Sequence, residues 1–133
     1  MGVVQLRALL DSHALLWWIL DDPALPPTAR EAISGMNNTI LVSAASAWEL
    51  AIKLRAGKLP EAGDLVSNFP AEIGQEGFQL LPISAEHCIR AGLLPGLHMD
   101  PFDRMLIAQS QAEDIPIISN EAVFDTYGVR RLW

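Results

Sequence analysis

Short apolar runs with strand character alternate with amphipathic runs of helical character along this chain, and this alternation constrains its fold most. The strand-like runs are expected at residues 7–10, 39–42, 79–82, 115–118 and 129–132. Helical patterns separate the first four of them, which is typical of a parallel sheet with helices on its faces. The sequence therefore predicts an α/β fold, a three-layer α/β/α sandwich with a mainly parallel central sheet.

Helix signals fill the intervals between these strands. They predict helices over 13–20, 28–34, 44–55, 62–75 and 85–92, another beginning at Pro101, and one turn at 120–125. Ser12, Ser43 and Ser84 each stand where an N-cap residue is wanted. Pro70 is placed to break the 62–75 segment, and residues 93–99 are expected to form a loop.

Length and composition fit one domain over residues 1–133. Half of the residues are apolar, and no linker, charge block or repeat divides the chain. The longest apolar run, 14–20, is far shorter than a membrane span, and no signal-peptide pattern follows Arg7. The single cysteine, Cys88, cannot form an internal disulfide, so we expect a buried thiol in a protein of the reducing cytoplasm.

The net charge of −7 argues against tight, nonspecific binding of nucleic acid, which usually needs a basic surface. It does not exclude cleavage of nucleic acid, because bound metal can cancel negative charge locally. The nine basic residues are also unevenly placed, with a small group at 53–58. An acidic chain further suits a basic protein partner.

Four acidic segments stand at the end of an expected strand or at a helix. They are Leu9-Leu10-Asp11-Ser12, Ala47-Trp48-Glu49-Leu50, Asp100-Pro101-Phe102-Asp103-Arg104 and Ser119-Asn120-Glu121. Carboxylates gathered from distant segments repel one another, and a fold that gathers them usually holds a divalent cation. Sites in parallel sheets form at the carboxyl ends of the strands. Asp11 and Glu121 each follow a strand, so we expect a metal site there.

Two of these acids have simpler interpretations. Asp11 could serve only as a helix cap, although Ser12 is available for that role. Glu49 could form a surface ion pair with Lys53 at i+4. Because Glu49 shares a helical face with apolar residues, we expect it to point partly inward, where it needs a metal, Lys53 or Arg104 as its partner.

The remaining acids also have structural alternatives. Asp100-Pro101-Phe102-Asp103 resembles a capping box, with Asp100 as N-cap and Asp103 at the third helical position. One carboxylate can cap the helix while the other reaches a cation, and Arg104 can steady either of them or a phosphate. Glu121 could simply start a helical turn.

Other kinds of site have weak support. The three histidines and the cysteine lack the spacing of zinc ligands, no Ser-His-Asp pattern is present, and the glycines are scattered rather than gathered in a phosphate loop. His98 is expected on a loop surface. Trp17 and Trp18 are expected in a core or an interface.

Four segments resemble the PIN-domain ribonucleases, and in particular the VapC-like toxins of bacterial type II toxin–antitoxin pairs. The run from His98 to Gln109, which contains Asp-Pro-Phe-Asp-Arg, is the most specific, and together the segments span the chain. The segments are LLDSHALLWW at 9–18, SAWELAIK at 46–53, HMDPFDRMLIAQ at 98–109 and FDTYGV at 124–129.

The resemblance implies a Rossmann-like α/β/α fold and RNA cleavage that depends on Mg²⁺ or Mn²⁺. Carried over by position, Asp11, Glu49 and Asp103 match the three core metal-binding acids, and Asp100 matches a further one. Glu121 stands where these proteins commonly have Asp, so it departs from the pattern by one methylene. The resemblance also implies a homodimer and a cognate antitoxin that blocks the acids.

The chemistry implied is hydrolysis of an RNA phosphodiester by metal-activated water. If three carboxylates lay about 5 Å apart, each pair would cost about 3 kcal/mol at an effective dielectric constant of about 20, so a cation or a proton must relieve the charge. Two alternatives are a non-catalytic interaction module of the same fold and a metal-dependent phosphatase.

Overall fold

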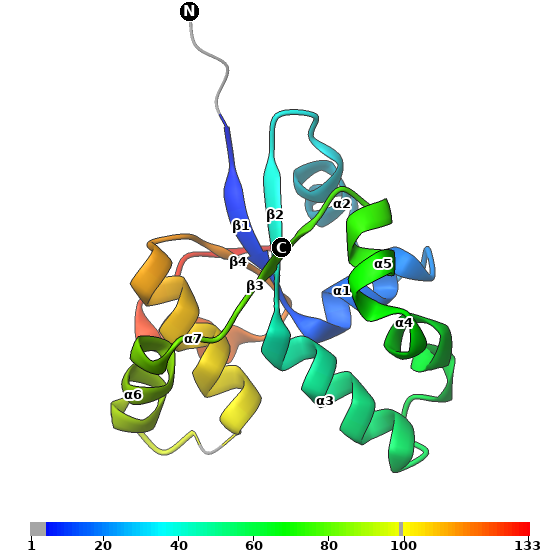
Figure 1. Cartoon of the computed structure of the whole chain (residues 1–133). Helices are drawn as coiled ribbons and strands as arrows, with labels where there is room; N and C mark the ends of the chain where they lie inside the picture. Colours follow the sequence, from blue (N-terminus) through cyan, green and yellow to red (C-terminus); the bar gives the residue numbers. More distant parts are fainter. Residues whose placement is uncertain (1–4, 99) are drawn as a thin grey trace, which may run out of the picture.

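The computed structural model describes residues 5–98 and 100–133, and its centre is one sheet of five parallel strands (Figure 1). The four N-terminal residues and Met99, the last residue of the expected 93–99 loop, lie outside the described part. The strands are β1 (Arg7–Leu10), β2 (Thr39–Ser43), β3 (Gln79–Leu81), β4 (Ile117–Ile118) and β5 (Arg131–Leu132). They are ordered β3-β2-β1-β4-β5, and all four pairings are parallel. The predicted α/β fold is confirmed.

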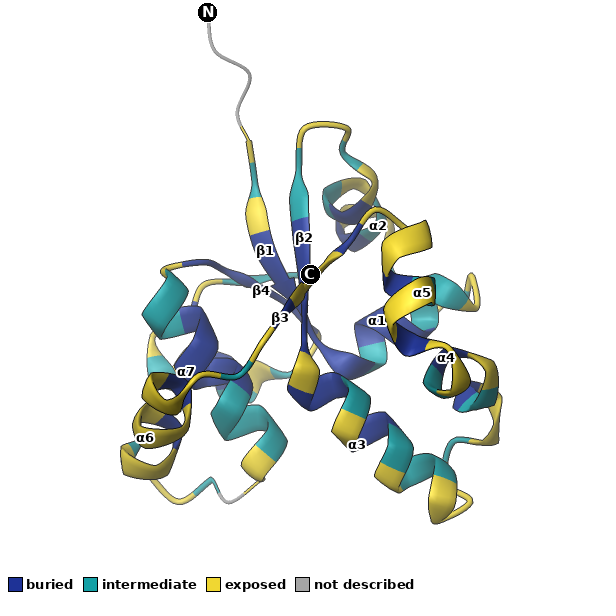
Figure 2. Ribbon diagram, viewed as in Figure 1, coloured by how far each residue is buried: buried dark blue, intermediate teal, exposed yellow. Residues whose placement is uncertain are grey.

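Successive residues of the central strands point to opposite faces of the sheet, and both faces are buried (Figure 2). Leu10 and Ile118 belong to one apolar cluster, while Leu9 and Ile117 belong to the other. The first cluster continues into helices α1 to α5, and the second continues into α7 and the segment after β4. Figure 1 shows α6 and α7 on one side of the sheet and α1 to α5 on the other, which makes three layers.

The helices agree with the expected segments within a few residues. They are α1 (Ser12–Ile19), α2 (Pro27–Ser34), α3 (Ala44–Arg55), α4 (Gly63–Ser67), α5 (Phe69–Gln75), α6 (Ala85–Leu93) and α7 (Pro101–Glu113), with 3₁₀ helices η1 (Pro60–Ala62) and η2 (Ala122–Tyr127). The expected helix at 62–75 is interrupted at Asn68, two residues before Pro70. None of the helices in the described ranges is long and apolar enough to cross a membrane.

Strands β4 and β5 are shorter than the expected runs. Pro116 has no N–H group to donate to a neighbouring strand, and β4 begins only after it, at Ile117. The Ile117 N–H donates to the carbonyl of Arg130, while the Pro116 carbonyl accepts from Leu9. Pro116 therefore takes part in the hydrogen bonding of the sheet only as an acceptor.

Two local expectations were wrong. The N-cap of α1 is Asp11, whose carboxylate accepts a hydrogen bond of 2.8 Å from the Ala14 N–H, whereas the Ser12 hydroxyl donates to Ser46 on α3 at 2.9 Å. Cys88 is exposed, because α6 buries the side of the helix that carries His87 and Ala91.

The sheet order places β1 between β2 and β4, so the chain winds away from β1 in both directions. Crevices for ligands form at such a switch point, beyond the carboxyl ends of the strands. Asp11 directly follows β1, and its N–H donates to the carbonyl of Ile118 at 3.2 Å. Ser119 and Glu121 follow β4, so two of the acidic segments meet at this edge.

Candidate metal centre and active site

Asp11 is a buried carboxyl at the end of β1, with 4% of its surface exposed. Burial raises its pKa from 3.8 to about 6, and repulsion from Glu121 adds to the rise. Hydrogen bonds from Ser119 and from the Ala14 N–H oppose the rise but do not cancel it. Asp11 therefore caps helix α1, and burial destabilises the ionised form of its carboxyl.

Asp103 lies in the first turn of α7, and 14% of its side chain is exposed. Burial raises the pKa of this carboxyl to about 7, with further rises from repulsion by Glu121 and Asp100. The contact with His98 opposes the rise: His98 Nε2 lies 2.8 Å from Asp103 Oδ2. The expected place of His98 on a loop surface was thus incomplete, because its ring is part of this site.

The negative charge of Glu121 acts on both Asp11 and Asp103. Its charge contributes to the raised pKa of Asp11 and also to that of Asp103. Its backbone N–H donates to the Ser119 hydroxyl at 3.0 Å, which fixes the turn between β4 and η2. Three acids from β1, α7 and the β4–η2 turn therefore share one region of negative potential.

Asp100 caps α7. One carboxylate oxygen accepts from the N–H groups of Phe102 and Asp103, both at 2.9 Å, and Pro101 occupies the first turn. The expected capping box is half formed, because the Asp103 carboxylate turns to His98. The full capping box of the described chain lies on α6, between Ser84 and His87.

Glu49 is held by Lys53, as one of the alternatives foresaw. It lies on α3 with 6% of its surface exposed, and its Oε2 is 2.8 Å from Lys53 Nζ. The Ser12–Ser46 hydrogen bond joins α3 to the start of α1, one turn before Glu49. Glu49 thus lies on the inward side of α3, but its charge is neutralised by a neighbour on the same helix.

Arg104 has a different role from the expected one. Its guanidinium donates to three backbone carbonyls, those of Ala91, Leu94 and His98, and not to a carboxylate. These bonds hold the segment between α6 and α7 and thereby place His98 against Asp103. Each nitrogen of the guanidinium thus donates to one carbonyl, which fixes the orientation of the group while it keeps its positive charge.

Gly96 fixes the same segment from the other side. Its φ of +93° is unfavourable for residues with a side chain, and a Cβ there would lie 2.8 Å from the Tyr127 hydroxyl. Tyr127 ends η2, the 3₁₀ helix that follows Glu121. The segment that carries His98 is therefore packed between α7 and η2.

Within residues 5–98 and 100–133, no group of three or more acidic, histidine or cysteine side chains is arranged closely enough to hold a metal ion. Asp11, Asp103 and Glu121 interact through their charges, Asp100 approaches Asp103, and Glu49 pairs with Lys53. The five acids stay a predicted site.

The chemistry of the donors nevertheless fits a divalent cation. All five candidates offer carboxylate oxygen, the ligand that Mg²⁺ and Mn²⁺ prefer. Asp11 is buried and Asp103 is partly buried, and both have raised pKa values, so each would gain from a nearby positive charge. A cation would be held by Asp11, Glu49 and Asp103, with Asp100 and Glu121 beside them.

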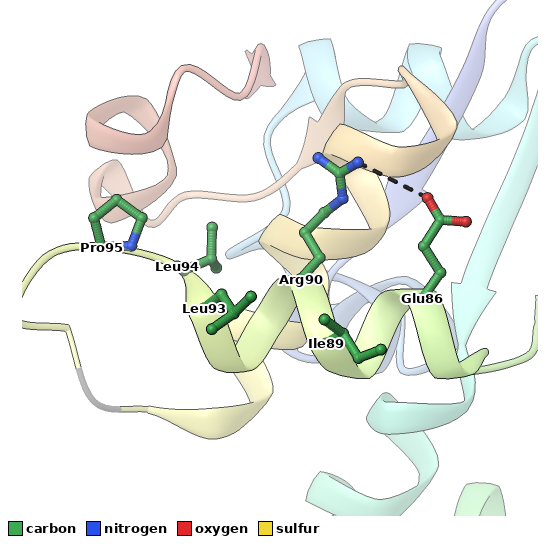
Figure 3. Close-up of a pocket in the computed structure, with 6 residues that line it drawn as sticks. All are labelled: Glu86, Ile89, Arg90, Leu93, Leu94 and Pro95. Carbon is green, nitrogen blue, oxygen red and sulfur yellow. Dashed lines mark ion pairs between the residues drawn. The ribbon is translucent and has the colours of Figure 1, made fainter.

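One cavity in the described part of the chain lies away from these acids. It has a volume of about 600 Å³ and lies along α6 and the residues after it, among Ile89, Leu93 and Pro95 (Figure 3). Figure 3 shows Arg90 and Glu86 joined across one turn of the helix, with 3.8 Å between their charged atoms. None of the five candidate acids lines this cavity.

Comparison with protein families decides the classification. The model of the PIN domain family matches residues 8–129, nearly the whole chain. The chain belongs to the PIN domain family. The matched range contains all five candidate acids.

Relatives of this PIN domain include VapC-type ribonucleases. Ribonuclease VapC16 of Mycobacterium tuberculosis (strain ATCC 25618 / H37Rv) is 41% identical over 58 residues, which are 44% of this chain. The chain thus aligns with 40% of that relative's length. The recognition of a VapC-like PIN domain from the sequence is confirmed at the level of family.

Two solved structures share the fold. VapBC2 from Rickettsia felis, crystallised with a DNA fragment from its promoter, matches with a TM-score of 0.68 at 17% identity, over 96% of this chain and all of that one. VapBC-1 from nontypeable Haemophilus influenzae matches with a TM-score of 0.65 at 14% identity, over 95% and 96%. At these identities the likeness shows the fold.

Proposed function

We propose that this PIN domain is a metal-dependent endoribonuclease that acts as the toxin of a toxin–antitoxin pair. The supporting observation is a pair of carboxyls, the buried Asp11 and the partly buried Asp103, whose pKa values are both raised and which share the repulsion of Glu121. Perturbed carboxyls of this kind at the switch point of a parallel sheet are a common mark of catalytic sites.

The side chains would divide the work. Asp11, Glu49 and Asp103 would be the principal ligands of Mg²⁺ or Mn²⁺, and Asp100 and Glu121 would supply outer negative charge. When bound, the cation supplies positive charge that offsets the phosphate and lowers the pKa of water. Asp11 is already held in place by its bond to the start of α1, so little rearrangement of this group is needed.

Glu49 is the side chain that must change partner. Its present bond to Lys53 satisfies the charge in the absence of a cation. A divalent cation carries twice the charge of the Lys53 ammonium, so it can displace this pair. The released Lys53 ammonium, 30% exposed, would then be free to meet the RNA backbone.

The relatives support the proposed toxin role. The two structures with the same fold are of VapBC proteins, one of them with promoter DNA, and the curated relative is a VapC ribonuclease. We therefore propose a cognate antitoxin, a homodimer of this chain and action on RNA in the cytoplasm. The net charge of −7 suits an antitoxin with basic segments.

Thermal melting with and without Mn²⁺, combined with an RNA cleavage assay, tests the proposal. We expect Mn²⁺ to raise the melting temperature of the wild-type protein and to support cleavage. Asp11→Asn should lose both effects while staying folded. Loss of the fold in this variant, or cleavage that survives EDTA, would contradict the proposal.

A second candidate is a non-catalytic interaction module. The bond between Glu49 and Lys53 and the double capping bond of Asp100 favour it, since both give the acids structural roles. On this alternative Mn²⁺ would not change the melting temperature. The same experiment therefore separates the two candidates.

A further inference from the structure

A second cavity of about 250 Å³ lies beside the candidate acids, between α3, α6 and α7. We name it the aromatic cleft, because Trp48 and Phe102 line it; Ile83, Cys88, Arg104 and Met105 are among its other walls. The two aromatic rings meet edge to face, with centroids 4.9 Å apart and planes at 78°. No step in the proposed cleavage uses this cleft.

We propose that the aromatic cleft binds one unpaired base of the RNA, next to the phosphodiester that is cut. This inference rests on the proposed function, and it adds the part of the substrate that the acids do not recognise. The argument depends on three properties of the cleft: its exposed aromatic surface, its largely apolar lining and its position.

The first property is the exposure of Trp48. Its relative exposure is 59%, although tryptophan is among the most apolar side chains and normally finds cover. An edge-to-face contact with Phe102 leaves much of the indole surface without a partner. Bases stack on such rings, and recognition of single-stranded RNA commonly relies on this stacking.

The second property is the largely apolar lining. Arg104 is the basic residue of the cleft, and each nitrogen of its guanidinium donates to a backbone carbonyl, which fixes its orientation but leaves its positive charge. The other walls named above are apolar apart from the thiol of Cys88. A neutral, flat ring would find apolar walls on most sides.

The volume limits the ligand further. About 250 Å³ lies below the range of about 300–1,000 Å³ that is typical of sites for drug-sized molecules. The space suits a single ring system better than a helix or an extended strand of a protein.

The third property is position. Trp48 directly precedes Glu49 on α3, and Pro101 and Phe102 stand between Asp100 and Asp103 on α7. Helices α3 and α7 thus each carry a candidate acid and, next to it in the sequence, a residue that lines the cleft. None of the five acids lines the cleft, so a molecule bound there would reach them only through an adjoining group of the same molecule. A nucleotide of the RNA substrate meets this condition.

The single cysteine makes the cleft directly testable. Cys88 lines the cleft and is exposed, so its alkylation by iodoacetamide reports whether the cleft is filled. We would measure this rate in EDTA with adenosine or uridine, and with ribose as the control without a base. Because nucleosides carry no phosphate and EDTA removes metal, the acids contribute nothing to this measurement.

The nucleosides should slow the alkylation of the wild-type protein in a saturable manner, and ribose should not. Trp48→Ala should abolish the protection, and Trp48→Phe should keep most of it. Leu93→Ala is the matched control, because Leu93 is 78% exposed and lines the other apolar cavity. In the cleavage assay, Trp48→Ala should weaken RNA binding about 5- to 150-fold, the range expected for one lost stack.

Each contrary result has a distinct meaning. Equal protection by ribose, or full protection in Trp48→Ala, overturns the inference. A fall in Cys88 reactivity with rising protein concentration, without nucleoside, also overturns it, because a second copy of the chain then covers the cleft. If nucleosides protect Cys88 but the protein does not cleave RNA in Mn²⁺, the nuclease proposal is refuted and the base site stands. If the protein cleaves RNA but Trp48→Ala binds RNA as tightly as wild type, the base site is refuted and the nuclease proposal stands.

Discussion

Replacement of Asp11 by asparagine should stabilise the metal-free protein, and the gain should grow with pH. Asparagine is as good an N-cap as aspartate and can still accept the bond from the Ala14 N–H, so α1 keeps its start. The change removes the buried charge and replaces one carboxylate oxygen by an NH₂ group, which can donate to the Ser119 hydroxyl. In most proteins the loss of a buried polar contact lowers the free energy of unfolding. A higher free energy of unfolding in Asp11→Asn would therefore be diagnostic of an unfavourable buried charge.

The magnitude follows from the pKa of Asp11, which burial raises from 3.8 to about 6. A carboxyl whose pKa is higher in the folded state costs stability when it ionises. The cost is absent below about pH 4 and is complete once the pH has passed the folded value. At about 1.4 kcal/mol for each tenfold change in proton affinity, it amounts to about 3 kcal/mol. For a chain of 133 residues, this corresponds to about 10 °C in melting temperature.

Urea denaturation in EDTA at pH 4 and pH 8 measures this difference. Wild type and Asp11→Asn should unfold with similar free energies at pH 4, and the variant should be about 3 kcal/mol more stable at pH 8. Asp64→Asn, at an exposed position of α4, is the control that should show no such growth. If Asp11→Asn is less stable than wild type at pH 8, Asp11 has a favourable electrostatic partner and the reasoning is refuted.

Three further changes test the neighbours of the acids. Lys53→Met should tighten Mn²⁺ binding at least about twofold in calorimetry, because Glu49 loses its competing partner; weaker binding would show that Lys53 assists the site. Arg104→Lys should lower the free energy of unfolding by about 1–3 kcal/mol and speed amide exchange at 94–98, because the fork to three carbonyls is lost; unchanged exchange would contradict this. His98→Ala should raise the pKa of Asp103 above about 7 in a carboxyl titration by NMR, and a fall would show that His98 is not its stabilising partner.

The layers of the fold were predictable, because residues 8–10 and 115–118 are apolar at every position, as strands buried on both faces must be. The order of the strands was not predictable from those runs. It depends on which apolar surfaces pair over long sequence distances, and every central strand offers a similar surface. Strand lengths were overestimated where Pro116 removed a donor from the ladder.

The site was predictable where a local rule applied. The spacing of Glu49 and Lys53 predicted their ion pair, and Asp100 followed by proline predicted a helix cap. The contact of His98 with Asp103 was missed because it depends on the backbone carbonyls that Arg104 binds, and carbonyls leave no mark in a sequence. Cys88 was placed wrongly because the buried side of α6 is set by packing against α7 and not by the hydrophobicity of single residues.

The claim that these remote acids form one cation site is tested most directly by titrating the protein with Mn²⁺ and following the free ion by electron paramagnetic resonance. Wild type should remove the signal of free Mn²⁺ with saturation, and Asp11→Asn and Asp103→Asn should each bind far more weakly at the same pH. Unchanged Mn²⁺ binding in both variants would mean that the carboxylates do not act together, and the proposed nuclease site would be wrong.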